Sequence, residues 1–107
     1  MEEIMSLTGK QKRFLRTQAH SMKPLFQIGK VGLNTVWIKE VKNALNKREL
    51  IKINLLQNAP SDTSEVREYL ETKTDFQVVQ EIGHILVLYR QADSEKNRDI
   101  SIKLKEL

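Results

Sequence analysis

The sequence predicts a single α/β domain: a four-stranded mixed sheet with three helices, in the order αβαβαββ. The chain has 107 residues, which is enough for one domain. Its apolar residues change repeatedly between helical spacing and two-residue alternation. Strands separated by helices imply right-handed parallel crossovers, whereas two final strands joined by a tight turn imply an antiparallel hairpin. We expect the helices to lie mainly on one face of this sheet.

The first helix is expected from about Gly9 to Ser21, with Thr8 as its N-cap. Pro24 ends this region and begins an extended segment over residues 25–28. On a helical projection, apolar residues gather on one side and cations on the other. The inward side holds Leu7, Phe14, Leu15, Gln18, Ala19 and Met22, and the outer side holds Lys10, Lys12, Arg13, Arg16 and His20.

A second helix is expected from about Thr35 to Lys47, capped by Asn34. A strand over residues 50–56 follows, with one face partly wet because Lys52 and Asn54 alternate with apolar residues. The inward residues of these two elements are Trp37, Ile38, Val41, Ala44, Leu45, Ile51, Ile53 and Leu55.

The third helix is expected to begin at Ser61 or Asp62 and to end near Lys73. Strands over residues 76–82 and 85–89 flank the turn Gly83-His84 and form a hairpin. Helical spacing places one set of side chains inward and an acidic set outward. These are Val66, Tyr69 and Leu70 on the inner side, and Glu65, Glu68 and Glu71 on the outer side.

From Arg90 onward the chain is polar and mixed in charge, which predicts a mobile tail. Ile100, Ile102 and Leu104 alternate within it, so a short edge strand is the alternative. We therefore divide the chain into an N-terminal extension at residues 1–6, a domain at 7–90 and a polar C-terminal tail at 91–107.

Composition excludes several classes of protein. With 39% hydrophobic and 30% charged residues, the chain has the balance of a folded globular domain. It has no cysteine, so it has neither a disulfide framework nor a thiol nucleophile. The longest apolar run, residues 85–89, is far shorter than the roughly 20 residues that span a bilayer. We expect a cytoplasmic protein without membrane contact.

The net charge of +4 is distributed unevenly along the chain. Residues 8–52 carry eleven basic and two acidic groups, whereas residues 53–107 carry seven basic and ten acidic groups. No acid lies between Lys10 and Lys39. Because ordinary solvated faces mix both signs, this acid-free stretch favours binding of a polyanion.

The turn at residues 29–32 is the most suggestive local site. Gly29 and Gly32 would allow positive φ angles and close approach of a ligand to the backbone. The following helix start favours an anion, and Lys30 adds a positive charge. A simple strand-to-helix turn with a solvated lysine is the alternative. The turn lacks the residues of a nucleotide-binding P-loop, since Val31 follows the lysine.

No catalytic or metal site can be assembled from the sequence. His20 and His84 are the only histidines, and they are too far apart in sequence to form a His-x-x-x-His pair. No serine lies in a Gly-x-Ser-x-Gly elbow. Trp37 fits the core better than a base-stacking role, and Tyr89 fits either. We expect no enzyme activity, no cofactor and no small-molecule substrate.

Taken together, the motifs resemble the CRM domain, and most closely the stand-alone bacterial YhbY-type proteins. The resemblance covers residues 7–90, and its parts occur in the family's order. They are Leu7-Thr8-Gly9-Lys10-Gln11, Ala19-His20, Lys23-Pro24, Ile28-Gly29-Lys30-Val31-Gly32-Leu33, Glu49-Leu50-Ile51-Lys52, Ile82-Gly83 and Leu88-Tyr89-Arg90.

The resemblance implies a fold similar to the C-terminal domain of translation initiation factor three. It implies RNA binding, with the Gly-x-x-Gly loop as a backbone clamp like that of KH domains. It also implies association with precursors of large ribosomal subunit RNA. We therefore expect a monomeric RNA-binding assembly factor; a module that docks an acidic partner protein is the alternative.

Expected RNA-binding residues come from two sources. Gly29, Lys30, Val31 and Gly32 match the family's loop, and Asn34 stands where many members have Thr. Lys10, Arg16 and Lys23 match basic positions of the family, and charge patterning adds Lys12 and Arg13. His84 departs from the lysine that is frequent after the hairpin glycine.

Overall fold

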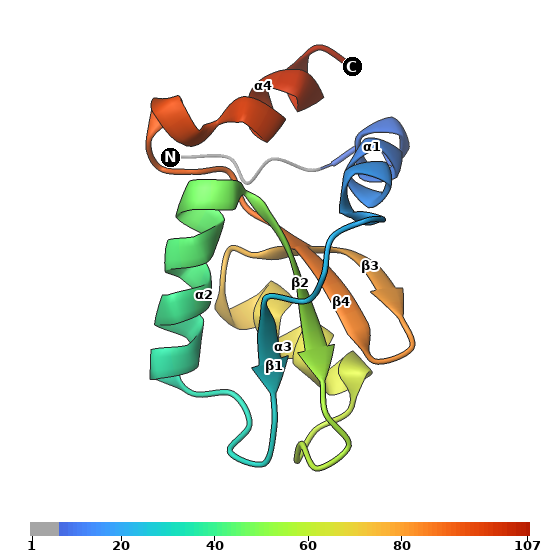
Figure 1. The fold of residues 1–107 in the computed structure, drawn as a ribbon, viewed down its shortest axis with the longest axis vertical. Helices are drawn as coiled ribbons and strands as arrows, with labels where there is room; N and C mark the ends of the chain where they lie inside the picture. The colour runs from blue at the N-terminus through green and yellow to red at the C-terminus, as the bar shows by residue number, and fades with distance from the viewer. Residues whose placement is uncertain (1–6) are drawn as a thin grey trace.

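The computed structural model describes residues 7–107, so the expected N-terminal extension at residues 1–6 lies outside it. The described chain forms a four-stranded mixed sheet covered by helices (Figure 1), which confirms the predicted fold class. Its elements are α1 (Gly9–Ala19), β1 (Phe26–Ile28), α2 (Thr35–Arg48), β2 (Leu50–Leu55), α3 (Thr63–Lys73), β3 (Gln77–Ile82), β4 (Ile85–Tyr89), a 3-10 turn (Glu95–Asn97) and α4 (Asp99–Lys105).

The strand order is β1-β2-β4-β3, so β1 and β3 form the edges of the sheet. β1 runs parallel to β2, with Phe26 opposite Ile53. β4 pairs antiparallel with β2 and with β3. The predicted parallel arrangement across a helix is therefore confirmed for β1 and β2, and the predicted hairpin is confirmed for β3 and β4, while β4 separates β2 from β3.

Polar caps fix where the first three helices begin. The Thr8 hydroxyl accepts a hydrogen bond from the Gln11 N–H at 3.1 Å, and the Gln11 side chain accepts one from the Thr8 N–H. Asn34 Oδ1 accepts from the Trp37 N–H at 2.9 Å. Asp62, rather than Ser61, caps α3 by accepting from the Glu65 N–H. Each cap satisfies an N–H that the first turn of a helix leaves unpaired.

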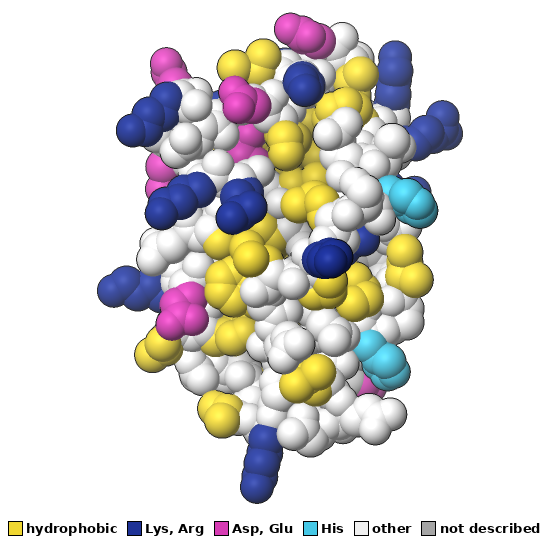
Figure 2. Space-filling model, viewed as in Figure 1, with side chains coloured by type: hydrophobic (Ala, Val, Ile, Leu, Met, Phe, Trp, Pro, Cys, Tyr) yellow, Lys and Arg dark blue, Asp and Glu magenta, His cyan; other side chains and the backbone are white. Residues whose placement is uncertain are grey.

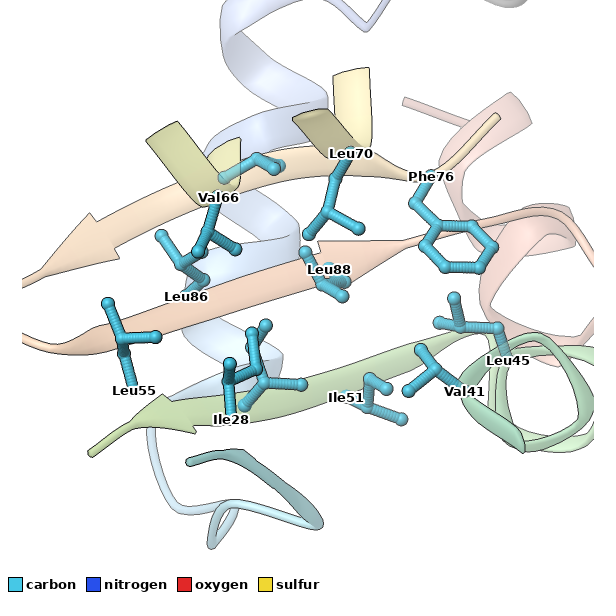
Figure 3. Packing of buried hydrophobic residues seen from close by; sticks show 12 residues of the cluster. Ile28, Val41, Leu45, Ile51, Leu55, Val66, Leu70, Phe76, Leu86 and Leu88 are labelled. Carbon is cyan, nitrogen blue, oxygen red and sulfur yellow. The ribbon is translucent and has the colours of Figure 1, made fainter. Parts of the chain in front are cut away.

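The larger core lies between the sheet and the helices α2 and α3 (Figure 3). Val41 and Leu45 reach it from α2, and Val66 and Leu70 reach it from α3. Tyr69 was expected to point inward, but it is 39% exposed. Val66 and Leu70, four residues apart, define the inner side of this short helix, and Tyr69 lies outside the stripe that they form.

A second core occupies the opposite face of the sheet. Leu15 and Ala19 of α1 and Leu104 of α4 pack there against Val87 and Tyr89 of β4. The expectation that helices lie mainly on one face is therefore wrong, because within residues 7–107 α2 and α3 cover one face and α1 and α4 cover the other. Gln18, expected on the inner side of α1, is also exposed.

The expectation of a mobile tail, or of a short strand, after Arg90 is wrong. Residues 99–105 form α4, whose Leu104 is fully buried. The cause is Glu49, which ends α2 in the left-handed region at φ 64° and is itself fully buried. Its carboxylate accepts from the N–H groups of Ala92 at 2.8 Å, Ile100 at 3.1 Å and Ser101 at 3.0 Å, and from the Ser101 hydroxyl.

Arg90 joins three segments at the same end of the sheet. Its guanidinium donates to both Asp75 oxygens at 2.9 and 3.0 Å, to Asn46 Oδ1 at 2.6 Å and to Asp93 Oδ1 at 3.1 Å. Burial opposes the charged form of Arg90, but the bonds to Asp75 and Asp93 outweigh it and raise its pKa. The charged side chain thus holds the start of the C-terminal segment to α2.

Tyr89 proves to be a core residue. It is fully buried, its hydroxyl lies 2.5 Å from the Ser101 hydroxyl, and burial raises its pKa. In the described range, no helix is both long and apolar enough to cross a membrane.

Candidate nucleic-acid interface

The loop between β1 and α2 is a tight turn with one indispensable glycine. The Gly32 N–H donates to the Gly29 carbonyl at 2.9 Å. Gly32 has φ 75°, and a Cβ there would stand 2.9 Å from Pro60 Cγ. Gly29 does not have a positive φ, and a Cβ there would lie 3.5 Å from its nearest neighbour. The expected need for glycine conformations therefore holds for Gly32 and is wrong for Gly29.

The tip of this loop projects into solvent. Val31 is 81% exposed, and Lys30 is exposed without an ion pair to any carboxylate in residues 7–107. A hollow of about 470 Å³ lies between the loop and the first turns of α2. At this point α2 leaves backbone N–H groups without intrahelical partners. The loop can therefore present donors, a cation and an apolar side chain to one ligand.

Trp37 forms the inner wall of that hollow. Its Nε1–H donates to the Gln27 carbonyl at 2.9 Å, and its ring meets Phe26 edge-on at 6.3 Å between centroids. The ring is half-buried against the larger core. These contacts agree with the expected core role of Trp37. They also hold its ring in place at the wall of the hollow beside the loop.

The cations of α1 are not equivalent. Lys10 and Arg13 are exposed, and Lys12 is half-buried. The Arg16 Nε–H donates to the Val79 carbonyl of edge strand β3 at 3.2 Å. Arg16 therefore stabilises the packing of α1 against the sheet, and its guanidinium is partly committed to that contact.

The structure separates the basic residues that were expected to form one surface. α1 lies toward the upper end of the long axis in Figure 1, and the loop after β1 lies at the lower end. The expectation that Lys30 extends the basic face of α1 directly is therefore wrong. Figure 2 draws several Lys and Arg side chains over the upper half of this view and one that projects alone at the lower end.

Two basic residues outside the predicted set lie near the amino end of β1. Arg48 at the end of α2 and Lys52 on β2 line one hollow with Lys23, which was selected. Lys23 and Lys52 are far apart in sequence, but the Leu25 N–H donates to the Lys52 carbonyl at 2.9 Å. The parallel pairing of β1 with β2 was the one signal that could have revealed this neighbourhood.

The acidic residues of α3 lie away from α1. Glu65, Glu68 and Glu71 are exposed, and α3 packs on the opposite face of the sheet from α1. Arg67 pairs with Glu71 at 3.3 Å and with Glu81 at 3.7 Å, so part of this acidity is balanced locally. The cations of α1 and the acids of α3 therefore lie on opposite faces of the sheet.

Other candidate sites are weaker. His20 and His84 are both exposed, the first at the end of α1 and the second in the hairpin turn. Within residues 7–107 there is no group of three or more His, Asp or Glu side chains placed to hold a metal ion.

Three comparisons with known proteins bear on this interface. The model of the CRS1 / YhbY (CRM) domain family matches residues 7–90. A Bacillus subtilis protein named "Probable RNA-binding protein YqeI" is 48% identical over 96 residues, which cover 90% of this chain and 98% of that protein. A Haemophilus influenzae protein named "RNA-binding protein" is 39% identical, and the match covers 87% of this chain and 94% of that protein.

A third relative and a solved structure are also similar to this chain. A Methanocaldococcus jannaschii protein, also named a probable RNA-binding protein, is 39% identical over 97 residues, covering 89% of this chain and 72% of that protein. Among solved structures, the solution structure of a hypothetical protein from Staphylococcus aureus superposes with a TM-score of 0.69 at 46% identity. That match covers 88% of this chain and 98% of the other.

Proposed function

The chain belongs to the CRS1/YhbY (CRM) domain family, and from this premise we propose that it binds RNA in precursors of the large ribosomal subunit and assists their assembly. The observation that carries the proposal is the loop at residues 29–32. Its left-handed Gly32 holds Lys30 and Val31 outward beside the first turn of α2. Relatives named as RNA-binding proteins support the nature of the ligand.

The proposed mechanism is stoichiometric binding without a chemical step. Lys10, Lys12 and Arg13 neutralise phosphates and release counterions, while Arg16 and Lys23 contribute at the margins of the same surface. Backbone N–H groups at the tip of the loop and in the first turn of α2 hold a phosphodiester, and Val31 offers an apolar contact to a base or a ribose. In this proposal the protein is not an enzyme, and it acts as a monomer in the cytoplasm.

Lys30→Glu tests the contribution of the loop to RNA binding. Because Lys30 is exposed and unpaired among residues 7–107, the substitution should leave the melting temperature nearly unchanged. RNA affinity at low salt should fall, since a negative charge replaces a phosphate contact. Lys39→Glu, at an exposed α2 position outside the loop, is the matched control. Equal affinities for the two variants across several structured RNAs would remove the loop from the interface.

The ribosomal part of the proposal has its own test. In a low-salt lysate, the protein should co-sediment with particles near the large subunit, and more with immature particles than with mature ribosomes. Recovery solely at the top of the gradient would contradict an assembly role while leaving RNA binding in place.

The exposed cations of α1 also favour a second candidate function, docking of an acidic partner protein. The two candidates differ in competition experiments. If RNA remains bound in an excess of polyglutamate, an acidic protein is not the preferred ligand. Complete displacement by polyglutamate at equal charge would favour the second candidate.

A further inference from the structure

A hollow of about 220 Å³ lies where three segments meet: the linker after α1, the end of α2 and the start of β2. This hollow does not include the loop at residues 29–32. It shares no lining residue with the hollow between that loop and α2. Its lining combines three cationic residues with three apolar residues. These are Lys23, Arg48 and Lys52, and Met22, Leu25 and Ile51.

Local structure explains why the three cations converge. Parallel pairing sets Leu25 beside Lys52, and the two-residue alternation of β2 turns Lys52 away from the larger core that holds Ile51 and Ile53. The Lys52 ammonium donates to the His20 carbonyl at 3.3 Å, which ties β2 to the end of α1. Arg48 occupies the last turn of α2 and is exposed.

No acid within the described residues neutralises this cluster. In residues 7–107, Lys23, Arg48 and Lys52 form no ion pair. Glu49, next to Arg48 in sequence, is fully buried, and its carboxylate is occupied by N–H donors of the C-terminal segment. The fold thus removes from the surface the negative charge that follows Arg48 in the sequence, and leaves the positive charges at the hollow.

Structural roles account for only part of this arrangement. A cation at the end of α2 is favourable because the helix dipole is negative there, which is sufficient for Arg48 alone. The contact with His20 is sufficient for Lys52 alone. Neither role explains Lys23, or why Leu25 remains 46% exposed between the cations. An apolar floor surrounded by cations matches a nucleotide, which joins a flat apolar base to an anionic phosphate.

We propose that this hollow is an RNA-binding subsite, in which Lys23, Arg48 and Lys52 hold a phosphodiester and its nucleoside rests on Leu25 and Met22. The inference rests on the proposed function and extends it to Arg48 and Lys52. The subsite also connects the basic residues of α1 with the loop at residues 29–32. The hollow lies at the amino end of β1, and the loop lies at the carboxyl end of the same strand. The four residue steps from Leu25 to Gly29 span about 13 Å of extended chain, so a short RNA segment can reach both.

The test compares two double variants that lose the same charge. Arg48→Gln combined with Lys52→Gln removes two cations of the hollow. Lys39→Gln combined with Lys47→Gln removes two exposed α2 cations that do not line it. Affinity for a short single-stranded RNA is measured against salt concentration. The slope of log affinity against log salt should fall by about 1.4 in the first variant, and affinity should fall about tenfold or more. In the second variant affinity should change less than about twofold, because salt screens cations that do not touch the RNA.

A second measurement locates the contact without a substitution. RNA containing 4-thiouridine is crosslinked to the wild-type protein, and the attached peptides are identified by mass spectrometry. Crosslinks to residues 22–25 support the subsite. Circular dichroism and urea unfolding establish that both double variants are folded before affinities are compared.

The outcomes separate this inference from the proposed function. Equal losses in the two double variants, with no crosslink at residues 22–25, overturn the subsite, while Lys30→Glu still decides the role of the loop. Unchanged RNA affinity with lost binding of polyglutamate would assign the hollow to an acidic protein. Failure of the wild-type protein to bind any RNA would overturn both.

Discussion

At the scale of single residues, Glu49 anchors the C-terminal segment to the end of α2. A buried carboxylate is stable only when its oxygens are fully hydrogen-bonded, and here three backbone N–H groups and one hydroxyl supply the donors. Ile100 and Ser101 belong to the first turn of α4, so the negative charge also meets the positive end of that helix. One side chain from the end of α2 thereby orders a segment about fifty residues away in sequence.

Glu49→Gln should therefore destabilise the protein strongly. Glutamine has nearly the same shape and tolerates the same backbone, but it turns an NH₂ group toward backbone donors. Leaving one or two buried donors unpaired costs about 1–3 kcal/mol each, so the free energy of unfolding should fall by about 2 kcal/mol or more. Urea unfolding measures the loss, and faster amide exchange at Ile100 and Ser101 would locate it. Glu40→Gln, at an exposed position on α2, should change stability by less than about 0.5 kcal/mol.

Alanine substitutions at the two loop glycines should have different effects on the stability of the fold. Gly32→Ala forces a side chain into the left-handed region, 2.9 Å from Pro60 Cγ, and should destabilise the fold by about 1–2 kcal/mol. Gly29→Ala meets only ordinary contacts, so unfolding should change by less than about 0.5 kcal/mol. RNA affinity should nevertheless fall in Gly29→Ala, because the added methyl group obstructs close approach to the backbone. Normal stability together with undiminished affinity would contradict a backbone clamp at Gly29.

At the scale of elements, the sequence predicts what local signals control. Thr8, Asn34 and Asp62 stand immediately before periodic apolar residues, and each caps a helix. β2 likewise follows from two-residue alternation, and β3 and β4 follow from the tight turn at Gly83 between them. These features depend on residues a few positions apart, so they can be recognised without knowledge of the tertiary structure.

The C-terminal helix could not be predicted in the same way. Its N-cap, Arg98, makes no side-chain capping bond, and the helix has seven residues, too few to be stable alone. Ile102 is 51% exposed while Leu104 is fully buried, so the apparent alternation carried no information about a strand. Partners distant in sequence order this segment. Glu49 accepts a hydrogen bond from the first turn of α4, and Leu104 packs in the second core with Val87 and Tyr89 of β4.

The Arg90 network makes the anchoring of this segment sensitive to pH. The hydrogen bond and charge of Arg90 hold the pKa of Asp93 below its ordinary value. A lowered carboxyl pKa in the folded state contributes stability above the unfolded value, near 3.9, and this is lost as the pH falls through the folded pKa. The difference in unfolding free energy between wild type and Asp93→Asn should be constant from about pH 5 to pH 7 and should shrink below about pH 4.

Urea midpoints across this pH range provide the measurement. Glu68→Gln, which removes an exposed carboxylate from α3, is the control for loss of one surface charge. A difference that grows on acidification would show that Asp93 does not stabilise the charged Arg90 in the folded protein.

At the scale of the whole molecule, the cations of α1 and the acids of α3 lie on opposite faces of the sheet. Residues 8–52 supply α1, the loop at residues 29–32 and the cations at the end of α2, whereas α3 carries exposed acids on the face of the sheet opposite α1. Counting charges could predict that two such regions exist. It could not predict that α1 and the loop lie at opposite ends, because that separation depends on how the sheet orders its strands.

This arrangement predicts how RNA affinity responds to salt. Each phosphate contact contributes about 0.7 to 0.9 to the slope of log affinity against log salt. Replacing Lys10, Lys12 and Arg13 together with Gln should lower RNA affinity and reduce the slope by roughly 2, if all three contact phosphates. Arg16 is left in place because its bond to the Val79 carbonyl supports the packing of α1.

The matched variant replaces Glu65, Glu68 and Glu71 with Gln. Gln serves as well as Glu at the third position of a capping box, so α3 should remain intact by circular dichroism. These carboxylates release no counterions on RNA binding, so the slope should stay close to that of the wild type. If the variant with Gln at positions 10, 12 and 13 has the same salt slope as the wild type, α1 lies outside the interface. The loop and the hollow beside Lys52 could still bind RNA in that case. An altered slope in the acidic variant would mean that RNA passes over both faces of the sheet, which the separation of α1 from α3 argues against.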